Sequence, residues 1–408
     1  MPLIRPFAGL RPTTEYHDQV VAPPYDVLNT AEAKVRAQDK PWSFLHISKP
    51  EIDLADDISP YDASVYQKGA SNLSSMIEKG VLKQDQDASY YVYKLIMGEH
   101  QQLGIMAVAS VAEYDVNRIK KHEFTRPKKE DDRVRQIEVL NAQTGPVFLV
   151  YKANQLIDNA LADIAKNKPD MDVTADDGVQ HSLWKVSDES WLNSITSEFD
   201  QMESIYIADG HHRSAAASRV AKNKTQENAA EEQPHDYFLS VIFPHNQMQI
   251  LDYNRVITDL NGLSNEAFLE KVSSNFTVKT SSQPYKPDAN AKFGLYLNKQ
   301  WYSLEYNGPS IDDPVKQLDV SLLANYLIEP ILNINDPRTD SRIDFVGGIR
   351  GLGGLEKRVD SGEMAVAFSL FPTSMDQLMA VADVNQVMPP KSTWFEPKLA
   401  DGLVSHLI

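Results

Sequence analysis

The greatest concentration of chemically active side chains lies in the run A-D-G-H-H-R near the middle of the chain. It contains a carboxylate, Asp209, followed by Gly210 and by three potential cations, His211, His212 and Arg213. A guanidinium holds two oxygens of one anion at once, and its planar fork matches phosphate. The pattern therefore predicts an anion site, with phosphate as the anion.

The neighbouring residues predict the strand, turn and helix that would position this site. Ile205–Ile207 is a short β-branched and aromatic run, which is typical of a buried strand. Gly210 interrupts it, and an alanine-rich stretch from about Ser214 favours a helix. A helix N-terminus offers free N–H groups and a positive dipole end. The alternative is that the aspartate only caps this helix and that the histidines lie half-exposed in its first turn.

A second charged segment contains the pattern H-E-x-T, with His122, Glu123 and Thr125. Pro127 prevents a helix from starting before it, so the helix expected next has Arg133 near its start. Histidine and glutamate are typical of general bases, metal ligands and ribose contacts. The alternative is a solvated charged loop, which is what runs of charge usually form.

A third segment, Val20–Leu28, reads V-V-A-P-P-Y-D-V-L. Its paired prolines stiffen the chain into an extended conformation, and Tyr25 and Asp26 follow at its exit. Such a segment lines a cleft or forms an edge strand that ends in a helix cap.

Two further motifs do not match known nucleotide-binding loops. Gly347–Gly354 reads G-G-I-R-G-L-G-G, but the spacing differs from G-x-G-x-x-G, so a tight turn with close packing is expected. Arg350 beside its bare amides is able to assist anion binding. Pro389–Thr393 reads P-P-K-S-T and lacks the glycines of a phosphate-binding loop.

Composition limits the possible partners. The 408 residues carry a net charge of −17, which argues against nucleic acid or an anionic membrane as the main partner. There is no cysteine, so disulfides and thiolate zinc sites are excluded. The N-terminus has no apolar core of signal-peptide length, and no apolar run approaches the length of a membrane span. We expect a soluble, cytoplasmic protein.

The elements along the chain predict a mixed α+β fold with mixed sheets. We expect three lobes, at residues 1–150, 151–310 and 311–408. Phe44–Ile47 favours a strand, and two β-rich runs ending near residue 111 favour a hairpin with a five-residue loop. Met248–Leu251 is expected to return along the strand before it, and Lys224–Gln233 to form a surface loop.

These motifs together resemble a known family. The A-D-G-H-H-R run is similar to the signature of the ParB/sulfiredoxin-like superfamily. The whole chain resembles one branch of it, domain-of-unknown-function family 1015. That resemblance rests on P-P-Y-D-V at Pro23–Val27, on H-E-x-T with Arg133 after it, on A-D-G-H-H-R, and on P-P-K-S-T-W-F at Pro389–Phe395. It implies a nucleotide-binding core with additional N- and C-terminal α/β elements.

The resemblance also implies an activity, because free-serine kinases carry a similar D-G-H-x-R segment. It suggests a nucleotide-dependent phosphotransferase that acts on a small hydroxylated metabolite such as free serine, with ATP or ADP and Mg²⁺. The roles that follow are phosphate or nucleotide contacts for seven residues, a metal contact for one of these, Asp209, and catalysis for three others. The nucleotide set is Asp209, Gly210, His211, His212, Arg213, Arg133 and Thr125, and the catalytic set is Glu123, Asp26 and His122.

Two alternatives from other classes remain open at this point. One is a metal-dependent phosphoester hydrolase, with aspartate, glutamate and histidine as ligands. The other is a non-catalytic regulatory protein that binds a nucleotide.

Overall fold

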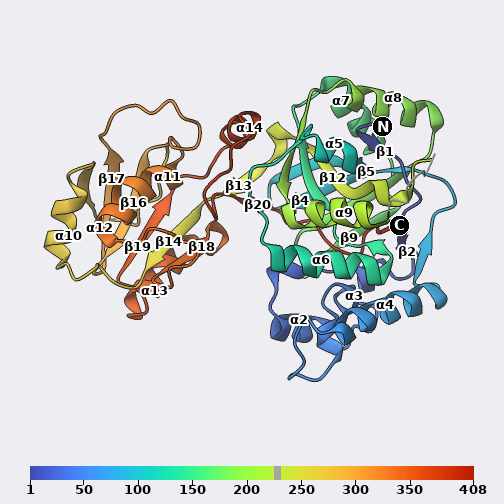
Figure 1. Ribbon diagram of the computed structural model, residues 1–408, viewed down its shortest axis with the longest axis horizontal. Coiled ribbons are helices and arrows are strands. Elements are labelled where there is room, and N and C mark those ends of the chain that lie inside the picture. The colour runs from blue at the N-terminus through green and yellow to red at the C-terminus, as the bar shows by residue number, and fades with distance from the viewer. Residues whose placement is uncertain (225–230) are drawn as a thin grey trace. The chain divides into compact units, whose positions relative to one another are not determined.

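The computed structural model describes residues 1–224 and 231–408, and most of the predicted surface loop at 224–233 lies outside the described residues. The chain forms two compact units, residues 1–248 with 397–408, and residues 249–396 (Figure 1). These units differ from the three lobes expected. A boundary after residue 150 would cut a strand that is paired on both sides, and one after residue 310 would divide the second unit.

The first unit is built around a mixed sheet. Among the described residues this sheet has nine strands in the order β6-β11-β8-β12-β5-β4-β10-β9, with β1 beside β5. Only the pairs β6–β11 and β8–β12 are parallel. The strands are β1 (Ile4–Arg5), β4 (Tyr90–Met97), β5 (His100–Ser110), β6 (Ile119–Lys120), β8 (Val147–Tyr151), β9 (Met171–Thr174), β10 (Gln180–Val186), β11 (Ile205–Asp209) and β12 (Tyr237–Pro244).

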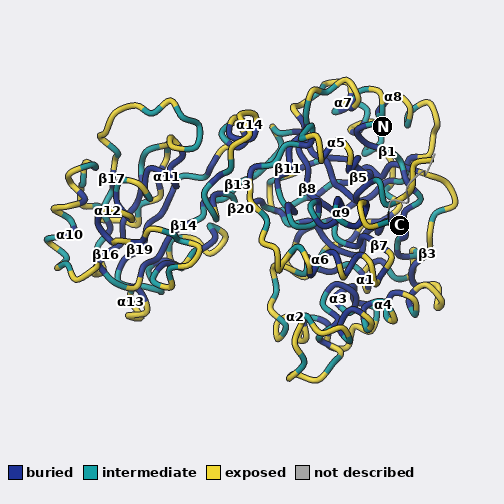
Figure 2. Tube along the Cα trace, in the orientation of Figure 1, coloured by how far each residue is buried: buried dark blue, intermediate teal, exposed yellow. Residues whose placement is uncertain are grey.

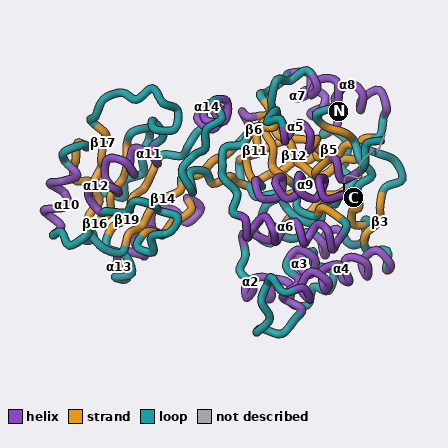
Figure 3. Tube along the Cα trace, viewed as in Figure 1, coloured by secondary structure: helices purple, strands orange, loops and turns teal. Residues whose placement is uncertain are grey.

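Helices, drawn in purple in Figure 3, and, among the described residues, two small sheets complete this unit. The helices are α1 (His17–Val20), α2 (Thr30–Ala37), α3 (Leu45–Ser48), α4 (Ala63–Glu78), α5 (Val111–Asp115), α6 (Pro127–Leu140), α7 (Gln155–Ile164), α8 (Glu189–Asp200) and α9 (His211–Lys224). The small sheets pair β2 (Leu10–Pro12) with β3 (Leu82–Gln84) and β7 (Ala142–Gln143) with β21 (His406–Leu407).

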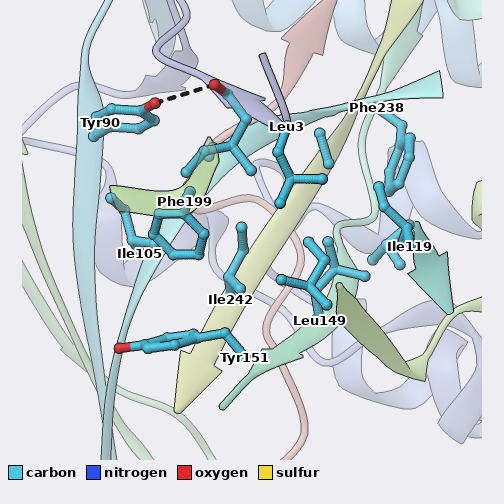
Figure 4. Close-up of a cluster of buried hydrophobic side chains, with 14 of the residues drawn as sticks. Leu3, Tyr90, Ile105, Ile119, Leu149, Tyr151, Phe199, Phe238 and Ile242 are labelled. Carbon is cyan, nitrogen blue, oxygen red and sulfur yellow. Dashed lines mark hydrogen bonds between the residues drawn. The ribbon is translucent and has the colours of Figure 1, made fainter. Parts of the chain in front are cut away.

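The core of the first unit lies against the central strands, which Figure 2 shows as buried. Figure 4 shows part of this cluster, where Leu149 and Ile242 pack together and Phe199 lies close by. Tyr90 belongs to the same cluster, and its hydroxyl is hydrogen-bonded to Thr196 Oγ1 at 2.7 Å. Each fully buried large apolar side chain stabilises the fold by roughly 1.5–3 kcal/mol.

Helix α6, which carries Arg133, and helix α9, which begins with the H-H-R residues, pack on each other. Val134 and Ile137 of α6 form a small apolar cluster with Ala216 and Val220 of α9. The small side chain of Ala216 lets α9 lie close to α6. This packing fixes the first turn of α9 relative to α6.

The second unit contains an antiparallel sheet of six strands among the described residues, in the order β15-β17-β16-β19-β14-β18. Its elements are β13 (Gln249–Leu251), β14 (Tyr253–Ile257), α10 (Asn265–Val272), β15 (Phe276–Ser281), β16 (Lys292–Leu297), β17 (Gln300–Tyr306), α11 (Asp319–Leu323), α12 (Glu329–Leu332), β18 (Ile343–Gly347), α13 (Gly351–Asp360), β19 (Val366–Leu370), α14 (Met375–Asp383) and β20 (Trp394–Glu396).

The predicted mixed α+β class is confirmed, but three local predictions are wrong. Residues 45–48 form α3 rather than a strand, because the short run Phe44–Ile47, apolar except for His46, fits either structure. The β4–β5 hairpin has a two-residue turn, since Met97 pairs with His100 and Gly98 supplies a φ of +60°. Strand β13 pairs with β20 instead of returning along β12. Among the described helices none is both long and apolar enough to cross a membrane.

Candidate functional site

The turn from β11 to α9 is tight. Strand β11 ends at Asp209, and α9 begins at His211, three residues earlier than the alanine-rich run predicts. Gly210 between them has a φ of +98°, and a Cβ there would lie 3.1 Å from Arg213 Nε. Glycine is therefore required both by the backbone conformation and by the close approach of the arginine. As a result, the H-H-R residues form the first turn of α9.

Arg213 lies at the centre of the site, and its side chain is only 10% exposed. Its Nη2 lies 3.8 Å from Asp26 Oδ2 and 3.7 Å from Asp209 Oδ1, and its Nη1 donates to the carbonyl of Pro146. Burial lowers the pKa of the guanidinium, but the nearby carboxylates of Asp26 and Asp209 outweigh that effect and raise it. Arg213 is thus permanently charged and held in one place.

Asp209 is shared between two cations. Lys398 Nζ lies 3.7 Å from Asp209 Oδ2, opposite the contact that Arg213 makes with Oδ1. Burial raises the pKa of this carboxyl, yet Lys398 and Arg213 together lower it to about 2. Separations of 3.7–3.8 Å exceed hydrogen-bond length, so these ion pairs are loose.

The two histidines of the turn are neutral, which corrects the expectation of three cations. Burial, followed by the proximity of His122, holds the pKa of His211 well below its usual range. Its Nε2 accepts a hydrogen bond from the backbone N–H of His122 at 3.3 Å, so its proton lies on Nδ1, 3.6 Å from Glu123 Oε2. The pKa of His212 is also lowered, first by burial, and its Nε2 accepts from the N–H of Arg126 at 3.0 Å.

His122 lies directly against the turn. Its ring meets that of His211 edge-on, with the ring centroids 4.4 Å apart. Burial lowers its pKa to about 4, and its Nδ1 is buried without a hydrogen-bond partner. Glu123 is half-exposed, and its Oε2 lies 3.6 Å from His211 Nδ1.

Helix α6 brings Arg133 to the same region. Its guanidinium stacks on the ring of Tyr25 at 4.0 Å and donates to Asp132 Oδ2 from Nε and Nη2, at 3.1 and 2.8 Å. Tyr25 is next to Asp26, so the P-P-Y-D segment contacts both arginines of the site. Thr125 instead donates to Glu130 Oε2 at 2.9 Å, a contact that ties it to α6.

A pocket lies between these elements. Its lining includes both arginines, Tyr25 and Asp401, and it encloses about 30 Å³, room for roughly two water-sized groups. Asp401 is brought there because the segment after the second unit returns, and Asp401 pairs with Ala22 just before the prolines. Burial raises the pKa of its carboxyl to about 7, even though Arg213 lowers it.

The structure brings most of the predicted residues together. Asp26, His122, Glu123 and Arg133 all lie around the β11–α9 turn. Sequence reasoning missed Lys398 and Asp401, because single charged residues in a loop carry no local signal. Within residues 1–224 and 231–408, no group of three or more His, Asp or Glu residues is arranged to hold a metal ion.

A family model described as "Protein of unknown function (DUF1015)" matches residues 4–321. The chain belongs to the DUF1015 family. That match covers the P-P-Y-D, H-E-x-T and A-D-G-H-H-R motifs, so the family predicted from them is confirmed. No curated protein matches the sequence.

Several solved structures are similar to this DUF1015 chain. A free serine kinase in complex with AMP has 12% identity and a TM-score of 0.36, covering 72% of this chain and 86% of its own. A conserved hypothetical protein from Pyrococcus furiosus has 12% identity and a TM-score of 0.36, covering 74% and 94%. SbnI with a C-terminal truncation, from Staphylococcus aureus, has 11% identity and a TM-score of 0.38, covering 73% and 86%.

Proposed function

We propose that this protein is a nucleotide-dependent phosphotransferase that transfers a phosphoryl group from ATP or ADP to a small hydroxylated metabolite such as free serine. The observation that carries the proposal is the position of Arg213. A permanently charged guanidinium is held in the first turn of a helix, next to a second arginine that lines the same pocket. In a chain of net charge −17, this is a specific place for an anion.

The nucleotide phosphates are assigned to the first turn of α9. There the backbone N–H groups and the fork of Arg213 take phosphate oxygens, and Lys398 adds a second positive charge 3.7 Å from Asp209. The loose ion pairs of Arg213 allow phosphate to compete with the carboxylates. His212 at the same turn is half-buried and neutral, so it contributes hydrogen bonds rather than charge.

The residues present fit a magnesium ion bound mainly through the nucleotide. Asp209 is ionised, its pKa being about 2, and Mg²⁺ usually takes one or two carboxylates together with phosphate oxygens and water. When bound, the ion would neutralise charge on the transferred phosphoryl group. The oxygen ligands of the ion would thus come mostly from the nucleotide phosphates and water, with Asp209 as the carboxylate from the protein.

Asp26 is the better candidate for the base. It lies 3.8 Å from Arg213, the arginine that would hold the phosphate, whereas Glu123 faces His211 at 3.6 Å. In the step that we propose, the acceptor hydroxyl oxygen forms a bond to the terminal phosphorus, and its proton passes to Asp26. The bond from that phosphorus to the bridging oxygen breaks, and the shortened nucleotide leaves with the electron pair.

The test is nucleotide binding followed by turnover. Calorimetric titration with ATP and ADP should show binding, and incubation with magnesium and a small hydroxy acid or amino acid should yield its phosphate ester in proportion to nucleotide consumed. Binding without transfer to any acceptor would indicate a regulatory protein. Release of free phosphate from simple phosphoesters, without a nucleotide, would indicate a hydrolase instead.

A further inference from the structure

Apart from Arg213, the polar residues that line the pocket beside the first turn of α9 take no part in the proposed phosphate contacts. The pocket is too small for a nucleotide, since it encloses only about 30 Å³. The polar residues of its lining are Tyr25, Ser48, Arg133, Gln136, Gln143, Thr144, Arg213 and Asp401. Such a lining suits a group of a few atoms that carries oxygen.

Ser48 shows that this lining is incomplete. The residue is 6% exposed, ends α3 and lines the pocket, yet its Oγ is fully buried without a hydrogen-bond partner. A buried hydroxyl without a partner is unfavourable, so native proteins seldom leave one without a reason. A ligand oxygen that meets a Ser48 hydroxyl rotated towards the pocket would give it the partner it lacks.

Arg133 gives the pocket its charge. Its side chain is 14% exposed, and it is fixed by stacking on Tyr25 and by two hydrogen bonds to Asp132. Tyr66 in turn donates to the other oxygen of Asp132 at 2.8 Å, so the whole group is rigid. Arg133 is therefore a preformed cation at the wall, and a planar anion is the ligand that a guanidinium matches.

We propose that this pocket is the acceptor subsite and holds the carboxylate of a small hydroxy acid or amino acid against Arg133 and the Ser48 hydroxyl. The inference rests on the proposed phosphotransferase function for its role in transfer. Arg213 lies on the shared wall, so an acceptor anchored here presents its hydroxyl towards the phosphate at the first turn of α9. A carboxylate of three heavy atoms fits the enclosed space.

Acceptor binding is measured without nucleotide, so that it does not depend on turnover. Calorimetric titrations of the full chain with L-serine, D-glycerate and ethanolamine show whether the carboxylate or the amine of the ligand is needed for binding. L-serine and ethanolamine differ by the carboxylate, and L-serine and D-glycerate differ by the amine. We expect ethanolamine to bind at least tenfold more weakly than the better of the two acids. Equal binding of all three, or binding of none, would overturn the subsite.

Ser48→Ala tests the contact directly, and Ser43→Ala is its matched control. Ser43 is also a buried serine before α3, but its hydroxyl accepts from the N–H of Leu45 and does not line the pocket. We expect Ser48→Ala to weaken binding of the preferred acid about three- to tenfold while ATP affinity is unchanged. Ser43→Ala should leave both affinities as they are.

The two proposals fail in different ways. If ATP and ADP do not bind but the acids do, the phosphotransferase function falls and the carboxylate pocket stands. If nucleotides bind but Ser48→Ala leaves acid affinity at the wild-type value, the pocket is not the acceptor subsite.

Discussion

Two turns in this chain have the same local plan, a strand, a glycine turn and a helix. In the first, β11 passes through Gly210 into α9, and in the second, β18 passes through Gly347–Gly351 into α13. Each has an arginine near the helix start. Arg213 is almost fully buried among carboxylates, whereas Arg350 is exposed to solvent.

The two turns differ in the residues that distant segments of the chain place beside them. The first turn is met by Asp26 from near one end of the chain and by Lys398 from near the other. The second turn is closed by packing, because a Cβ at Gly347 would lie 2.8 Å from ring atoms of Trp394 and one at Gly348 would lie 2.6 Å from Asp252 Oδ1. A local pattern thus predicts a turn, and distant segments decide whether it becomes a site.

The largest effect is expected on the rate of phosphoryl transfer when Asp26, the proposed general base, is changed. Asp26→Asn keeps shape and removes the proton-accepting charge, so phosphoryl transfer should fall by about two to four orders of magnitude with little change in nucleotide affinity. Asp344→Asn is the matched control, since Asp344 in β18 is also a half-exposed aspartate paired with an arginine, Arg358, at 3.0 Å. Normal turnover in Asp26→Asn and a large loss in Glu123→Gln would move the role to Glu123.

The next effect separates the two arginines. Lysine keeps the charge of Arg213 but loses the planar fork, so Arg213→Lys should weaken ATP and ADP binding by about 1.5–3 kcal/mol. Arg350→Lys should leave both affinities unchanged. Melting curves are needed alongside, because any change at Arg213 also disturbs its pairs with Asp26 and Asp209. Equal nucleotide affinities in all three proteins would end the phosphate-site assignment.

A smaller effect separates the two glycines. Gly210 and Gly351 both have positive φ, +98° and +62°, but a Cβ at Gly351 would have nothing within 4 Å. Gly351→Ala should therefore cost only the backbone strain, about 1–2 kcal/mol, and Gly210→Ala should cost more because Arg213 must shift. Urea unfolding of each variant measures the difference. Equal losses would show that Arg213 is not held against Gly210.

A dependence of stability on pH is also expected, at one buried carboxyl in each unit. Burial raises the pKa of Asp401 in the first unit and of Asp319 in the second to about 7. Between pH 4 and 7 the folded state therefore binds more protons than the unfolded state, so each carboxyl lowers stability as pH rises. Asp401→Asn and Asp319→Asn should each remove part of that fall in the free energy of unfolding.

Added ATP distinguishes these two carboxyls. Arg213 lowers the pKa of Asp401, and phosphate bound to that arginine would offset part of its charge. The contribution of Asp401 should then shift to higher pH, while that of Asp319 stays in place. Identical shifts for both carboxyls would contradict the assignment of phosphate to Arg213.

The sequence was informative where a residue type has few structural uses. Gly210 followed by two histidines and an arginine predicts both the turn and an anion site, and the turn is where it was expected. It was uninformative about charge state, because neutral His211 and His122 result from burial that only the folded chain provides. Lys398 could not be found either, since its role depends on a return of the chain across the whole second unit.

That return has a consequence for the order of folding. The second unit is inserted in the chain between β12 and the segment that carries Lys398 and Asp401. Residues 249–396 must be synthesised before this segment exists, and at about 5–20 residues per second this takes roughly 7–30 s. During that interval the nascent chain contains the β11–α9 turn with Arg213, but Lys398 and Asp401 have not yet been made. Ser405 pairs with Leu10, and β21 pairs with β7, only after residues 249–396 have been made, so these contacts of the site form after the second unit has been synthesised.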